Sequence, residues 1–214
     1  MIPSKRQIAD LLSRHFRLGN TWNLNAQGLV DVNGSVVVKE QPKDKLCVAF
    51  GNVSGHFVCE ALNLPTLEGA PHSVGGQFTW FQTNLRSLVG APQTVSGSFT
   101  VGNNQLTSLQ GGPQEVGGDY GVYLNHLTSL EGAPQSVGKR VLISYYPDTP
   151  LLKLFNYKHI NFIKDDAPMP EIWQDLFNPI KHPELQGGGK VAMMKAVAIL
   201  SKAGLYKNNP NAQL

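Results

Sequence analysis

The sequence is poor in charge and in cysteine, and it has no long apolar run. Charged residues make up 15% of the 214 residues, compared with about 25% in an average soluble domain. The two cysteines, Cys47 and Cys59, are too few for a disulfide framework, which favours a reducing compartment. No stretch approaches the ~18 apolar residues of a membrane span, and the N-terminus lacks the apolar segment of a secretory signal. We therefore expect a cytoplasmic protein with no membrane partner.

Motifs for catalysis, cofactors and metals are also lacking. The six histidines show neither H-x-x-x-H nor H-x-H spacing, and the two cysteines have no partners in a zinc-binding pattern. The run from Gly187 to Lys190 is similar to part of a phosphate-binding loop, but Val191 follows where that loop has Ser or Thr. No nucleophile is paired with a base. We predict no catalytic, cofactor-binding or metal-binding residue, and hence a protein that is not an enzyme.

Glycine, by contrast, is abundant, and a 21-residue repeat accounts for much of it. The chain has 22 glycines. Apolar residues recur four, six and fourteen positions after each repeated valine, and a glycine stands two positions after the first five valines, until Lys139 breaks this column. Further leucine, glycine and proline columns hold in the four central copies. The six valines that mark the repeat are Val32, Val53, Val74, Val95, Val116 and Val137.

The repeat columns predict one turn of a solenoid. Two apolar residues at period two, such as Phe99 and Val101, are typical of one face of a short strand. A glycine just before this strand, such as Gly97, would permit a left-handed turn into it, and the proline column favours an extended return. The segments between repeats are too short for a helix of usual length. We therefore predict a mainly β repeat solenoid of about six coils, which stack into a parallel sheet and bury a common core.

The repeat resembles the leucine-rich repeat. The segment Phe99-x-Val101-x-x-Asn104-x-Leu106-x-x-Leu109 matches the core pattern of that family, although only Asn104 and Asn125 keep the asparagine. The segment LTSLEGAPQSVG at 127–138 is similar to repeats of small, uncharacterised leucine-rich proteins of tailed bacteriophages and bacteria. The resemblance covers about residues 30–154. It implies a leucine-rich-like scaffold that presents a concave sheet to a partner.

The flanks of the repeat are expected to be helical caps. We divide the chain into residues 1–30, an N-terminal helical cap with an entry strand; 31–154, the solenoid; and 155–214, a helical C-terminal cap. Ser4 to Gly19 predicts an amphipathic helix with Ser4 as its N-cap and Gly19 after its C-terminus, followed by an entry hairpin.

Two helices are expected in the C-terminal part. One spans Pro168 to Phe177, and the other spans Gly189 to Ala203 and is closed by Gly204. We expect them to pack on the last coil. The alternative is that they form a separate partner-binding element.

Residues that alternate with the inward columns predict a binding face. They point away from the core, and equivalent residues lie on adjacent strands, so they form one patch. The patch is low in charge and carries aromatic residues, which suits a protein interface. The alternative is that Phe81 and Tyr123 only cover glycines on neighbouring strands. The predicted partner-binding residues are His56, Gln77, Thr79, Phe81, Thr100, Asp119, Tyr123, Arg140, Tyr145 and Tyr146.

These observations predict a non-enzymatic protein-binding module. The resemblance further implies a phage-encoded factor that binds and inhibits a defence or regulatory protein in the host cytoplasm. Two alternatives stay open. One is nucleic-acid binding through the basic flanks, although a net charge of +3 without a clustered basic face argues against it. The other is a targeting scaffold for an activity in the C-terminal part. The oligomeric state is not predicted. The basic residues of the first alternative are Lys190, Lys195, Lys202 and Lys207.

Overall fold

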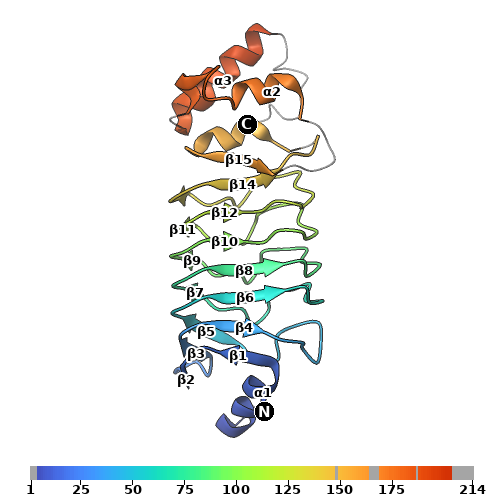
Figure 1. Ribbon diagram of the computed structural model, residues 1–214, viewed down its shortest axis with the longest axis vertical. Coiled ribbons are helices and arrows are strands. Elements are labelled where there is room, and N and C mark those ends of the chain that lie inside the picture. Colours follow the sequence, from blue (N-terminus) through green and yellow to red (C-terminus); the bar gives the residue numbers. More distant parts are fainter. Residues whose placement is uncertain (1–3, 148, 164–168, 187, 204–214) are drawn as a thin grey trace.

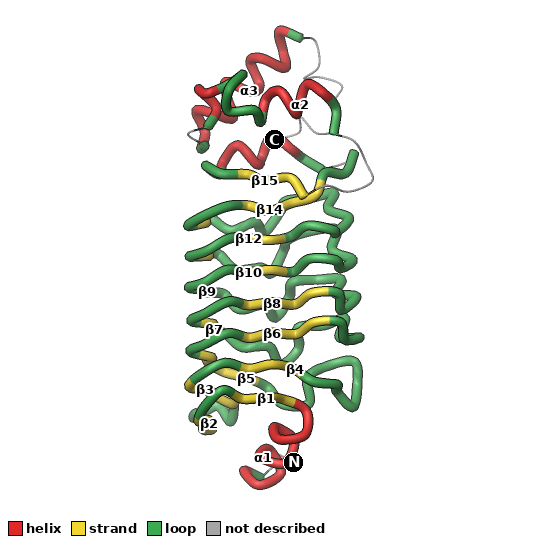
Figure 2. Tube along the Cα trace, in the orientation of Figure 1, coloured by secondary structure: helices red, strands yellow, loops and turns green. Residues whose placement is uncertain are grey.

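The computed structural model is a column of stacked coils with helices at both ends (Figure 1). It describes residues 4–147, 149–163, 169–186 and 188–203. Equivalent strands recur every 21 residues and stack parallel to one another along the column (Figure 2). The predicted mainly β solenoid of about six coils with terminal helices is therefore confirmed.

The strands form two sheets rather than the single sheet that we predicted. The second sheet is built from the repeated valines themselves, in strands mostly two residues long, which leave little periodicity to detect. The eight-stranded sheet contains, in order, β1 (Phe16–Leu18), β4 (Val36–Val38), β6 (Phe57–Glu60), β8 (Phe78–Phe81), β10 (Phe99–Thr100), β12 (Tyr120–Gly121), β14 (Val141–Ser144) and β15 (Ile160–Ile163). The seven-stranded sheet contains β2 (Thr21–Leu24), β3 (Val30–Asn33), β5 (Phe50–Val53), β7 (Ser73–Val74), β9 (Thr94–Val95), β11 (Glu115–Val116) and β13 (Ser136–Val137).

Equivalent positions of the repeat pair across the coils. Phe78 pairs with Phe57 on one side and with Phe99 on the other, and the pairing is parallel. Among the described residues, only the N-terminal strands pair antiparallel: β1 lies against β4, and β2 forms the expected entry hairpin with β3. At the other end the eight-stranded sheet continues past residue 154, because β15 pairs parallel with β14.

The core consists of columns of side chains that stack on themselves. Phe57, Phe78, Phe99 and Tyr120 are almost fully buried, and their rings stack with centroids 5.3–5.9 Å apart and planes within 14° of each other. Each such pair contributes about 1 kcal/mol beyond its buried area. Cys59 lies in the adjacent inward column and is fully buried, as predicted from its position in the repeat.

The left-handed turns predicted for the glycines just before the strands occur instead in the second glycine column. Apart from Gly34, the glycines just before the strands do not have left-handed backbone. They lie against the backbone one coil earlier: a Cβ on Gly97 would be 2.5 Å from the carbonyl oxygen of Gly76. The left-handed turns lie instead in the return segment, where φ is 82–91°. Sequence reasoning could not separate the two roles, because glycine satisfies both. The left-handed column is Gly69, Gly90, Gly111 and Gly132.

Two buried asparagines hold the corners that follow the strands. Asn104 Oδ1 accepts hydrogen bonds from the backbone N–H groups of Thr83 and Leu85, both at 3.0 Å. Its Nδ2 donates to the carbonyl oxygens of Trp80 and Gly102 at 2.8 and 3.0 Å. Asn125 forms an equivalent set one coil later. These side chains satisfy backbone groups that no strand partner reaches.

The N-terminal helix begins as predicted and ends earlier. The helix α1 (Lys5–His15) starts with a capping box, in which Ser4 Oγ accepts from Gln7 N–H and the Gln7 side chain accepts from Ser4 N–H. It ends at His15 because Phe16 is extended and enters β1, so the expected helix end at Gly19 was wrong. Ile8 on this helix is buried against the core.

The C-terminal part contains both predicted helices. Beyond η1 (Leu151–Asn156) and β15 lie α2 (Glu171–Leu176), η2 (Pro183–Leu185) and α3 (Gly189–Lys202), and α3 contacts η1 and η2. The expected helix ends at Pro168 and Gly204 lie outside the described residues. Within the described part of the chain, no helix is both long and apolar enough to cross a bilayer.

We predict that Asn104→Ala destabilises the fold by about 3 kcal/mol, because it leaves several buried backbone groups without partners. Urea unfolding followed by circular dichroism measures this loss. The matched control is Gln110→Ala, which alters an exposed side chain in a turn. Equal stability of the two variants would contradict the role assigned to Asn104.

Candidate functional site

The eight-stranded sheet places eight of the ten predicted binding residues on one surface. We call this surface the outer face. It consists of the side chains within residues 56–144 that alternate, along the eight-stranded sheet, with the buried side chains. Phe81 lies on β8 and Tyr123 lies just past β12, and the parallel register sets residues 21 apart next to each other. Tyr145 and Tyr146 come directly after β14 and lie beyond this surface.

The polar residues that precede the strands bond to one another's backbone. His56 Nδ1 accepts from Gln77 N–H at 2.9 Å, so that nitrogen carries no proton in this bond. Asp119 Oδ1 accepts from Arg140 N–H at 3.1 Å in the same way. The same link from one coil to the next joins Ser35 Oγ to His56 N–H and Ser98 Oγ to Asp119 N–H. These side chains therefore stabilise the stack, and much of their hydrogen-bonding capacity is used within the chain.

The charged pair on the outer face is also satisfied internally. Arg140 Nε and Nη2 donate to Asp119 Oδ1 and Oδ2 at 3.1 and 2.8 Å, which is a two-point contact. The hydrogen bonds from the Arg140 side chain lower the pKa of the Asp119 carboxyl, and the carboxylate raises the pKa of Arg140. The Asp119 side chain is only 19% exposed, so little of its charge faces outward.

Two of the predicted residues are buried, which does not fit the prediction that they contact a partner. Thr79 is 5% exposed, and its hydroxyl accepts a hydrogen bond from Gln77 Nε2 at 2.8 Å. Tyr145 is 6% exposed, because the inward and outward alternation stops at the end of β14 and its ring joins the core. Tyr146 is half-buried, with its ring centroid 5.3 Å from that of His126.

Phe81 and Tyr123 meet above a glycine that lies just past the strand between them, β10. Their ring centroids are 6.2 Å apart and their planes are inclined by 49°. A Cβ on Gly102 would lie 2.8 Å from Tyr123 Cε2 and 3.0 Å from Phe81 Cε2, so the rings fill the space that a side chain there would occupy. The rings do cover a glycine, as one of our alternatives stated, yet both remain half-exposed. Thr100 lies on the same middle strand and is also half-exposed.

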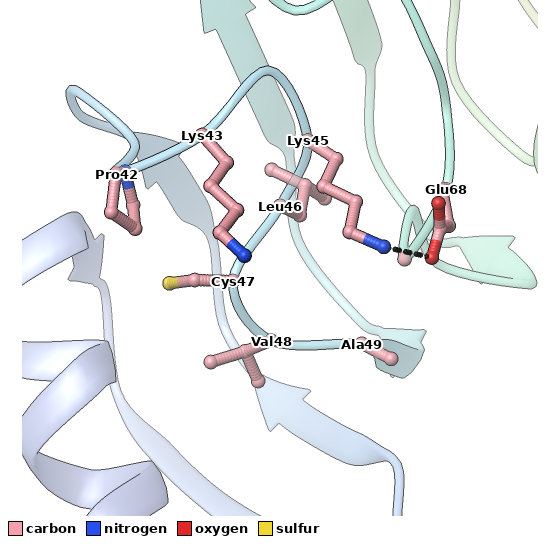
Figure 3. A pocket seen from close by; sticks show the side chains of 9 residues that line it. Pro42, Lys43, Lys45, Leu46, Cys47, Val48, Ala49 and Glu68 are labelled. Carbon is pink, nitrogen blue, oxygen red and sulfur yellow. Dashed lines mark hydrogen bonds and ion pairs between the residues drawn. The ribbon is translucent and has the colours of Figure 1, made fainter.

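A pocket of about 430 Å³ lies in the loop between β4 and β5, which sequence reasoning did not single out (Figure 3). Gln41 holds this loop: its Nε2 donates to the His15 carbonyl, and its Oε1 accepts from Cys47 N–H. Lys45 in the pocket pairs with Glu68 at 2.6 Å. Burial raises the pKa of the Cys47 thiol, so the thiol stays protonated and is a poor nucleophile.

The described residues offer no cluster of three His, Cys, Asp or Glu side chains that could hold a metal ion. Comparison with protein-family models, with curated proteins and with solved structures finds no match to this chain. On the outer face, several polar side chains are hydrogen-bonded within the fold, and the rings of Phe81 and Tyr123 are half-exposed.

We predict that Asp119→Asn lowers stability at neutral pH and that the loss disappears in acid. The folded-state pKa of Asp119 is lowered, so its stabilising contribution is present above the ordinary pKa of about 4 and is lost as the pH falls through the folded-state value. Urea midpoints of both proteins between pH 7 and pH 2.5 test this. A difference that stays constant down to the lowest pH would contradict it.

Proposed function

We propose that this chain is a non-enzymatic protein-binding module whose partner contacts the outer face around Phe81 and Tyr123. One observation carries the proposal: these two rings touch each other on a surface whose neighbouring polar groups are already bonded within the fold. Burial of the exposed ring surface is then the main gain that this face offers on contact.

The charge of the outer face favours a protein over a nucleic acid. Its charged residues are Glu60, Asp119 and Arg140, and the last two neutralise each other. Binding to phosphates needs several unpaired lysines or arginines on one surface. Interfaces between proteins, in contrast, are depleted of charge at their centre and enriched in aromatic residues.

The stacked sheet also holds this face in a fixed shape before any partner arrives. Phe99 N–H donates to the Asp119 carbonyl and Val101 N–H to the Gly121 carbonyl, and similar bonds link the other coils. Side chains on such a backbone lose little conformational freedom on binding, which lowers the entropic cost of association. Large aromatic residues in this setting are typical sites of strong interface energy.

A narrower form of the proposal concerns the partner. We suggest a phage-encoded factor that occludes a defence or regulatory protein of the host cell. The support for this form is the resemblance of the repeat to small leucine-rich proteins of tailed bacteriophages, together with the absence of a recognisable catalytic motif in the sequence. The broader proposal of a protein-binding face does not depend on it.

We predict that Phe81→Ala combined with Tyr123→Ala weakens binding of the partner by about tenfold or more, because the exposed rings supply the buried area. Tagged protein would first capture the partner, mass spectrometry would identify it, and isothermal titration calorimetry with purified partner would give the Kd.

The matched control is Val89→Ala, which truncates an exposed apolar residue away from the outer face. Circular dichroism would verify that each variant is folded. An unchanged Kd in the folded double variant would show that the partner binds elsewhere.

A further inference from the structure

The helix α3 presents an apolar stripe to solvent at the far end of the column. Val191 and Met194 are 66% and 61% exposed, whereas Ala192, Ala196 and Leu200 on the other side of the helix are buried. In Figure 1 the helix lies at the end of the molecule opposite α1, beyond β15. The stripe is thus separated from the outer face.

The stripe has the spacing of a helix-pairing seam. Val191, Met194, Ala198 and Ser201 follow one another at intervals of three and four residues, as the a and d positions of a heptad do, and all four are exposed. We call these four residues the α3 stripe. The small side chains in its second half would let a second helix approach closely.

Lysines border the α3 stripe on both sides. Lys190 occupies the position before the first seam residue, and Lys195 and Lys202 occupy positions directly after Met194 and Ser201, which are the g and e positions of a heptad. All three are exposed, and none forms an ion pair with another described residue. The helix itself contains no acidic residue.

We propose that the α3 stripe binds an amphipathic helix of a partner protein, with acidic residues on both sides of the partner's apolar seam. Charge complementarity carries the proposal, because glutamates at the facing e and g positions would pair with the three lysines. A second copy of the same helix would bring lysines against lysines, which disfavours self-pairing.

Other occupants fit less well. A lipid surface is favoured by large apolar or aromatic side chains on the apolar face, and the α3 stripe has only valine, methionine, alanine and serine. Residues 204–214 of the same chain contain no aspartate or glutamate side chain, so they do not complement the lysines. Nucleic acid would engage the lysines but would leave the apolar seam uncovered.

The probe for this site is a synthetic three-heptad peptide with isoleucine at a, leucine at d and glutamate at e and g. We expect NMR shift changes confined to α3 when this peptide is added to the full chain, and a Kd that rises with salt. A peptide with lysine in place of glutamate should bind at least tenfold more weakly. Equal binding of the two peptides would overturn the proposal.

Variants separate the seam from the charges. Val191→Glu should weaken binding of the acidic peptide at least tenfold, while Val89→Glu, at a valine of similar exposure on the solenoid, should leave it within twofold. The triple change Lys190→Glu, Lys195→Glu and Lys202→Glu should reverse the preference and favour the lysine peptide. No reversal of preference would overturn the role of the lysines.

Three further measurements address the other occupants. The first is binding of phosphatidylglycerol vesicles or of duplex DNA. If the triple lysine change abolishes this binding and Val191→Glu does not affect it, the site is a general cationic patch and the proposal is overturned. Tighter peptide binding after removal of residues 204–214 would show that this segment is the resident occupant, which also overturns it. The Phe81→Ala and Tyr123→Ala change should leave peptide binding unchanged, so failure here and failure of the proposed function are distinguishable.

Discussion

The in-register stacking of one 21-residue coil on the next is the constraint on which the rest of the structure depends. Each strand residue pairs with the residue at the same repeat position in the neighbouring coil, as Phe57 does with Phe78. One glycine column permits the close approach of the backbones, and the other turns the chain with positive φ. Because the strand pairs from β4 to β14 and from β5 to β13 keep this register, each side chain there lies next to its own counterpart. A residue type is therefore acceptable at a given position only if it packs well against itself or its near equivalents.

This arrangement also decides the chemistry of the surface. A polar side chain before a strand has the backbone N–H of the next coil within reach, and His56 and Asp119 both bond to it. The same repetition that builds the sheet thus engages surface polar groups in hydrogen bonds within the chain. Aromatic residues behave differently, because the carbon faces of their rings form no such hydrogen bond. Phe81 and Tyr123 occupy alternate strands and close over Gly102, which leaves part of each ring exposed.

Much of the fold could be predicted because a repeat averages out local ambiguity. Six copies of one pattern predicted the inward columns, and Cys59 and the stacked phenylalanines lie where that pattern put them. The second sheet was missed because its strands are as short as two residues and show almost no alternation. The end of α1 was missed because Gly19 is a good helix terminator, while the pairing of Phe16 with Val38 in the sheet decided the outcome. Contacts across coils decided much of the rest: the bond from Gln77 N–H to His56 joins two neighbouring coils, and the ring of Tyr145 is buried in the shared core.

The two proposed surfaces differ in charge because one lies on the repeated coils and the other lies on a helix outside the repeat. The outer face lies on repeated coils, where outward charges either pair with the next coil or repel their own counterparts, and only Asp119 with Arg140 forms such a pair there among the described residues. The helix α3 lies outside the repeat, so its lysines meet no copy of themselves. In a column where each coil contacts only its neighbours, a change on α3 has no direct path to Phe81 and Tyr123. The solenoid would therefore hold two partners at a fixed separation without making the binding of one depend on the other.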